Sequence, residues 1–185
     1  EKFSTPDLRQ AHVWVDSLLT DFGGIKPSEN PRIQRVPSAL VVFPETFLHE
    51  GIQERYGNAF KPIHALDTVL QAYPGTSLLI GASTYELYNA GEETPTSRPI
   101  DTQGRRFYDS YNTAIELTNS QPMEFYHKSK LVVGVEYMPF ASTLKSLIGD
   151  ATIALGGTTG TLGTQEKREV FALSDTTIKV APIIC

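Results

Sequence analysis

The chain has 185 residues, of which 40% are apolar and 20% are charged, and its formal net charge is −5. This length and composition are typical of a single globular domain. The negative charge and the lack of a basic run argue against a nucleic-acid surface, and no stretch has the roughly 20 consecutive apolar residues of a membrane-spanning helix.

The first half of the chain predicts two helices and two buried strands. Apolar residues at helical spacing predict a helix over Leu8–Phe22, and a second one over Ile63–Tyr73 that ends at a Pro-Gly pair. The segments "ALVVFP" (39–44) and "SLLIGAS" (77–83) are short, continuously apolar runs. Runs of this kind are typical of strands that are buried on both faces.

The second half of the chain predicts mainly strands and loops. Residues 86–110 are polar and rich in turn residues, which predicts an exposed loop or hairpin. Further elements are predicted in chain order: a strand at 111–118, a strand from 123 that becomes irregular before 140, a short helix over Ala141–Leu147, a Gly- and Thr-rich loop followed by a strand at 154–173, and a last strand at 176–185. Strands that alternate with helices indicate an α/β layered fold.

Three reactive side chains lie at or just past the ends of predicted strands. Glu45 follows "VVFP", Lys128 lies in "FYHKSKL", and Cys185 follows "VAPII". A carboxylate can take the proton of a thiol as a general base, and an ammonium group can favour the thiolate and stabilise an oxyanion. Together the three residue types would support acyl transfer through a thioester.

Other interpretations of the same residues stay open at this stage. A single cysteine at the end of an apolar strand is often a buried structural residue, and a lysine in "HKSK" is usually solvated. Cys185 could instead pair with His49 or His127. No two of the four histidines have the i, i+4 spacing of a metal-binding pair, which argues against a zinc site.

The three segments that carry these residues resemble the nitrilase (carbon–nitrogen hydrolase) superfamily. "VVFPET" is similar to the segment that holds its glutamate, "YHKSKL" to its lysine segment, and "APIIC" to the strand that ends in its nucleophile. The order of the three segments also matches. The resemblance implies that Glu45 is the general base, that Lys128 is the catalytic lysine and that Cys185 is the nucleophile.

One longer motif resembles a particular branch, the apolipoprotein N-acyltransferase family. In "YHKSKLVVGVEYMPF" (126–140), the residues that match that pattern include Lys128, Glu136 and the Pro-Phe pair at 139–140. The resemblance implies a second carboxylate at the site, Glu136, which acts on the tetrahedral intermediate or holds Lys128. The motif departs from the family at Lys130, which stands in place of a histidine, and at "VGV", which stands in place of "PFG".

The resemblance implies a four-layer α-β-β-α nitrilase-like sandwich, of which residues 1–185 are a catalytic domain fragment that is incomplete at both ends and expected to be inactive alone. Members of this branch are integral proteins of the bacterial inner membrane, with this domain in the periplasm and transmembrane helices elsewhere in the chain. The implied reaction belongs to lipoprotein biosynthesis. An acyl chain passes from a phospholipid to the cysteine, and from there to the N-terminal amine of a diacylglyceryl lipoprotein, with no metal or organic cofactor.

Two rival functions use the same sequence features. A soluble nitrilase-type amidase or carbamoylase would use the same three residues and release its acyl group to water. A non-catalytic domain could keep the fold without the chemistry, and it would not need Cys185 near Glu45 and Lys128.

Overall fold

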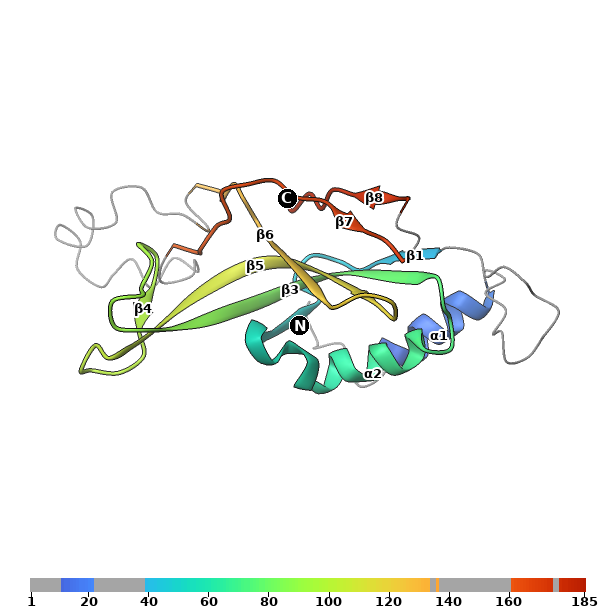
Figure 1. Cartoon of the computed structure of the whole chain (residues 1–185), viewed down its shortest axis with the longest axis horizontal. Coiled ribbons are helices and arrows are strands. Elements are labelled where there is room, and N and C mark those ends of the chain that lie inside the picture. Colours follow the sequence, from blue (N-terminus) through green and yellow to red (C-terminus); the bar gives the residue numbers. More distant parts are fainter. Residues whose placement is uncertain (1–10, 22–38, 134–135, 137–160, 175–176) are drawn as a thin grey trace, which may run out of the picture.

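The computed structural model of the chain describes residues 11–21, 39–133, 136, 161–174 and 177–185. Within these residues, six strands form one mixed sheet with two helices against one of its faces (Figure 1). A separate pair of short strands, β7 (Phe171–Ala172) and β8 (Lys179–Val180), lies on the other side of the sheet.

The centre of the sheet is a long antiparallel pair. Strand β3 (Thr76–Asn89) runs beside β5 (Arg106–Thr118), and Ser83 lies opposite Asn112. On the outer edge of β3, the parallel strands β1 (Ala39–Val42) and β2 (Leu48–Gln53) follow one another. On the outer edge of β5, β6 (Glu124–His127) and the short β4 (Arg98–Pro99) pair in antiparallel fashion.

The main hydrophobic core lies between the sheet and its two helices. Helix α1 (Ala11–Asp21) contributes Val15 and Leu19, and helix α2 (Lys61–Leu70), which follows the 3₁₀ helix η2 (Glu54–Ala59), contributes its own apolar face. Alternate residues of the central strands complete this core: Leu78, Ile80, Ala82, Ile115 and Leu117. Because side chains alternate along a strand, the intervening residues face the other side of the sheet.

The second face of the sheet carries a smaller apolar cluster and the polar residues that matter below. Ala114 and Tyr126 pack there with Phe171, and Leu79 and Ile184 lie against them. The Ser77 hydroxyl accepts a hydrogen bond from the Ser174 backbone amide at 3.0 Å, which fastens the β7 segment to β3. The segment that leads to Cys185 therefore covers the face of the sheet opposite to the helices (Figure 1).

Most of the predicted elements are confirmed within the described residues, although their ends differ. Both helices form: α1 fills the part of its predicted range that the structure describes, and α2 begins two residues and ends three residues earlier than predicted. The predicted excursion at 86–110 is a hairpin, since β3 continues to Asn89 and β5 begins at Arg106. Strand β2 and helix η2 have no counterpart among the predicted elements. The helix predicted over Ala141–Leu147 lies outside the described residues.

The predicted last strand is wrong in its extent. Only Lys179–Val180 pairs as a strand, and residues 181–185 have no strand pairing. Pro182 has no backbone N–H to donate to a ladder, which limits pairing at this point.

The sheet and its helices form a mixed α/β fold, as the sequence predicts. No helix in the described ranges is both long and apolar enough to cross a membrane.

Candidate active site

Glu45 lies in a turn that interrupts the outer edge of β3. The chain pairs with β3 as β1, leaves it after Phe43, and returns as β2 from Leu48 onward. The Phe47 amide donates to the Pro44 carbonyl at 3.3 Å, and Thr46 has a φ of 57°. A positive φ at the third position is that of a type II turn, and it is strained for a β-branched residue. The strained residue therefore stands next to the candidate base, where such strain commonly occurs.

Gly81 lets this turn lie directly on the sheet. A Cβ atom at Gly81 would lie 2.4 Å from the Pro44 carbonyl oxygen and 2.7 Å from the Glu45 Cα atom. Both of these are backbone atoms, which cannot move aside as the end of a flexible side chain can. The absence of a side chain at Gly81 thus allows the backbone of Glu45 to lie in close contact with β3.

We expect Gly81→Ala to destabilise the protein and to displace Glu45. Overpacking against backbone costs about 1–3 kcal/mol, which corresponds to a drop in Tm of at least ~2 °C for a domain of this size. Thermal unfolding measures this effect. Gly91→Ala is the comparison variant. Its φ of +91° is unfavourable for alanine, but no atom lies within 4 Å, so it measures backbone strain without overpacking. A Gly81→Ala protein as stable as the wild type would contradict the close approach.

Lys128 follows directly on β6 and is the buried cation of the site. Its backbone amide donates to the Asn112 carbonyl at 2.8 Å, and its side chain is only 3% exposed. The ammonium nitrogen lies 2.9 Å from both carboxylate oxygens of Glu136 and 4.0 Å from Glu45 Oε1. It also donates to the backbone carbonyl of Cys185. Lys128 is therefore not a solvated lysine, and it contacts all three of the other predicted site residues.

Glu136 is the carboxylate that lies closer to Lys128. Its Oε2 accepts from the Val132 amide at 2.8 Å, and its own backbone amide donates to the Val132 carbonyl at 3.0 Å. Burial alone would raise the pKa of Glu136. The hydrogen bonds from Val132, Lys128 and Asn112, with the charge of Lys128, outweigh burial and lower this pKa below its ordinary value. Glu136 is therefore the ionised partner of the buried lysine.

Asn112 is a site residue that the sequence did not single out. It lies in the middle of β5, and its Nδ2 donates to Glu45 Oε1 at 2.8 Å and to Glu136 Oε1 at 3.1 Å. The available signal was weak, because Asn112 is one of three polar residues in the strand "YNTAIEL", with Thr113 and Glu116. That signal alone could not identify its partners, because they depend on the register of β3, β5 and β6.

Cys185 lies at the end of the segment that crosses the second face of the sheet. It is exposed, as the last residue of the given sequence. Cys185 and Glu45 line the same small cavity of about 170 Å³, together with Asn112, Gly81 and Pro182. The cavity brings the only cysteine of the sequence next to the candidate base.

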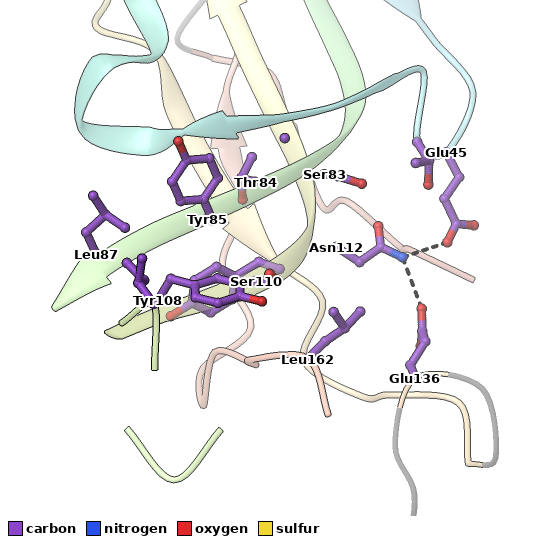
Figure 2. Close-up of a pocket in the computed structure, with 14 residues that line it drawn as sticks. Glu45, Ser83, Thr84, Tyr85, Leu87, Tyr108, Ser110, Asn112, Glu136 and Leu162 are labelled. Atoms are coloured by element: carbon purple, nitrogen blue, oxygen red, sulfur yellow. Dashed lines mark hydrogen bonds between the residues drawn. The ribbon is translucent and has the colours of Figure 1, made fainter. Parts of the chain in front are cut away.

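A larger cavity of about 810 Å³ opens beside the same group. Glu45, Asn112 and Glu136 form one end of it, while Tyr85, Leu87 and Tyr108 lie at the other end (Figure 2). Its surface is mostly apolar, with further apolar contributions from Ile100 and Leu162. The two cavities share Glu45 and Asn112 in their walls. An apolar ligand in the large cavity would thus reach the polar group that borders Cys185.

His127 belongs to a different group, on the helix side of the sheet. Its Nε2 lies 2.7 Å from Glu54 Oε1, and its ring stacks on Tyr111 with 3.8 Å between the ring centroids. Glu54 also accepts from the Thr84 hydroxyl at 2.5 Å. No hydrogen bond joins His127 or His49 to Cys185 within the described residues. A Cys–His pair therefore has no support, and the Glu54–His127 contact helps to fix the residue that precedes Lys128.

In the part of the chain that the structure describes, no three His, Cys, Asp or Glu side chains are grouped so that they could hold a metal ion. A scan against protein-family models and a search of curated proteins each found no match to the chain.

Proposed function

We propose that this domain is an acyltransferase that forms a thioester on Cys185 and passes the acyl group to an amine. The observation that carries the proposal is the buried ammonium of Lys128, which contacts Glu45, Glu136 and the Cys185 carbonyl at once. Burying a lysine costs free energy unless it is paired. Both carboxylates close to Lys128 line the large cavity, which makes this lysine a candidate for chemistry on a ligand bound there.

The first half of the proposed reaction consumes a phospholipid. Glu45 takes the proton of the Cys185 thiol, and the sulfur attacks the ester carbonyl of an acyl chain. Lys128 stabilises the negative charge that develops on the carbonyl oxygen. The C–S bond forms and the ester C–O bond breaks, so that the lysophospholipid leaves with the proton from Glu45.

The second half consumes an amine. The N-terminal amine of a diacylglyceryl lipoprotein attacks the thioester carbonyl, an amide bond forms, and the C–S bond breaks. Glu45 takes one proton from the amine, and the sulfur of Cys185 recovers its proton. This step requires the thioester to survive until the amine arrives, and the apolar surface of the large cavity favours an acyl chain over water.

The wider setting of this activity is part of the same proposal. The resemblance to the apolipoprotein N-acyltransferase family supports a four-layer α-β-β-α sandwich for the complete domain. It also supports a position in the periplasm, with anchoring in the inner membrane through segments outside this chain. The sheet and the helices on one of its faces would supply two of those four layers.

One observation favours hydrolysis as a second candidate function. The Glu45 side chain is 41% exposed, so water can reach the candidate base. A nitrilase-type amidase or carbamoylase would use that water to release its acyl group. The two functions differ in how long the thioester lasts.

The test is to incubate the intact protein with phospholipid vesicles and to follow the peptide that contains Cys185 by mass spectrometry. For an acyltransferase we expect an acyl mass that accumulates with lipid alone and disappears when a diacylglyceryl-cysteine peptide is added. Free fatty acid without an accumulated adduct would instead indicate a hydrolase. If neither an adduct nor free fatty acid forms, both candidate functions are contradicted.

A further inference from the structure

Two negative side chains of the site share one uncharged donor. The carboxylates of Glu45 and Glu136 both contact the same nitrogen, Nδ2 of Asn112, at 2.8 and 3.1 Å. Two carboxylates that contact one nitrogen repel each other when both are ionised. Lys128 offsets the charge of Glu136 at 2.9 Å but lies 4.0 Å from Glu45. The contact that holds Glu45 at short range is therefore the one from Asn112.

Asn112 is the sole hydrogen-bond donor to the Glu45 side chain among the residues that the structure describes. Because Nδ2 carries two hydrogens, one can serve each carboxylate. Figure 2 shows this nitrogen between the two glutamates, with the amide oxygen on the other side. The reverse orientation would place the amide oxygen against two carboxylates, so the neighbours fix the direction of the amide.

The amide oxygen of Asn112 is itself buried and has no hydrogen-bond partner among the described residues. A buried acceptor that lacks a donor costs roughly 1–3 kcal/mol. Folding stability alone would therefore favour a residue without this oxygen. What Asn112 contributes is therefore the pair of hydrogen bonds that its nitrogen donates.

We propose that Asn112 is a positioning residue that holds Glu45 in place as the general base and keeps it close to Glu136 without neutralising it. The residue type follows from the geometry. A lysine or arginine would supply donors but would also add a second cation beside the base, whereas serine or threonine offers only one O–H. An amide supplies two donors and no charge. The assignment of Glu45 as base rests on the proposed function, but the contacts of Asn112 can be tested without it.

The first test measures those contacts directly. In protein with carbon-13-labelled glutamate, NMR titration gives the pKa of Glu136, and the carboxyl carbon-13 shift at neutral pH reports the hydrogen bond of Glu45; Glu45→Gln and Glu136→Gln provide the assignment. We expect Asn112→Leu to raise the pKa of Glu136, because its carboxyl loses a donor that favours the ionised form. The carboxyl carbon-13 shift of Glu45 should change as well, because Glu45 loses its hydrogen bond from Asn112. A folded Asn112→Leu protein in which neither quantity changes would overturn the proposal, whether or not the protein transfers acyl groups.

The second test asks whether the position matters for the reaction. We expect Asn112→Leu to lower the rate of adduct formation about 100-fold, the size expected for a misplacement of ~1 Å, with little change in the lipid concentration needed for half the maximal rate. At neutral pH, Asn112→Asp should form the adduct as slowly as Asn112→Leu does. Its rate should recover in part toward about pH 5, where the new carboxyl takes up a proton and offers one donor.

Asn119→Leu is the matched control, since Asn119 is exposed and its side chain has one hydrogen bond among the described residues, to the Leu70 carbonyl at 3.4 Å. Its adduct rate should equal that of the wild type. An Asn112→Leu protein that reacts at the wild-type rate would contradict the positioning role, even if the NMR experiment shows that the hydrogen bonds are lost. If the wild-type protein forms no adduct at all, the proposed function fails and the NMR titration alone decides the contacts of Asn112.

Discussion

Cys185→Ala is expected to abolish the acyl adduct. Alanine has no nucleophile, so no thioester can form, and removing a catalytic nucleophile lowers a rate by a factor on the order of 10⁴ or more. Cys185→Ser should remove nearly all of the adduct, because a hydroxyl is much harder to deprotonate than a thiol. Folding should be unaffected, since Cys185 is exposed. Mass spectrometry after incubation with lipid measures the adduct, and thermal unfolding checks the fold.

The same experiment separates true catalysis from adventitious acylation. Lysine side chains can also be acylated by reactive lipids, and the exposed Lys130 is close to the site in sequence. Lys130→Met is therefore the companion variant and should leave the adduct in place. An adduct that persists in Cys185→Ala would show that another residue carries the acyl group, and the proposed mechanism would be ruled out.

Lys128→Met is expected to damage both activity and stability. It leaves Glu136 without its cation, and breaking a buried ion pair in this way costs about 3–5 kcal/mol. The oxyanion also loses its stabilising charge, which costs on the order of 10²–10³ in rate. Adduct formation and chemical denaturation measure the two effects. Lys130→Met again serves as the control, because it removes the same charge from an exposed position.

The stability loss in Lys128→Met should depend on pH with a defined sign. Lys128 is one of the groups that lower the pKa of Glu136 in the wild type. A group with a lowered pKa contributes stability that is present above its unfolded pKa and is lost as the pH falls. Without Lys128 this contribution is smaller, so the difference between variant and wild type should shrink toward acidic pH. Lys128→Met/Glu136→Gln should recover stability but not activity, and equal loss at every pH would contradict the ion pair.

The grouping of Glu45, Lys128 and Cys185 could be predicted from the sequence, whereas the extent of the strand that leads to Cys185 could not. Strand ends in layered folds meet at one edge, and the structure brings these three residues together with Glu136. That reasoning needs only the order of apolar runs and polar residues. The last strand was predicted too long, because an apolar, β-branched run says nothing about whether a pairing partner is available.

Asn112 and Gly81 show what the sequence leaves undetermined. Asn112 becomes a site residue only through its register opposite Ser83 and beside the end of β6, and a shift of one residue would turn it to the helix side. Gly81 reads as an ordinary small residue in a buried strand. Its importance follows from the turn that crosses it, and the path of that turn depends on how β1 and β2 share the edge of β3.

The wide spacing of the site along the chain has a consequence for folding. Glu45, Asn112, Lys128 and Cys185 come from four different segments, and their contacts close long loops of sequence. Contacts of this kind form slowly, because the entropy of loop closure must be overcome before they are gained. We therefore expect the nucleophile, its base and the buried cation to meet late in folding. Until then Cys185 is an ordinary thiol, so a chain still being synthesised should not acylate itself, and reactivity toward lipid should appear with the final refolding phase.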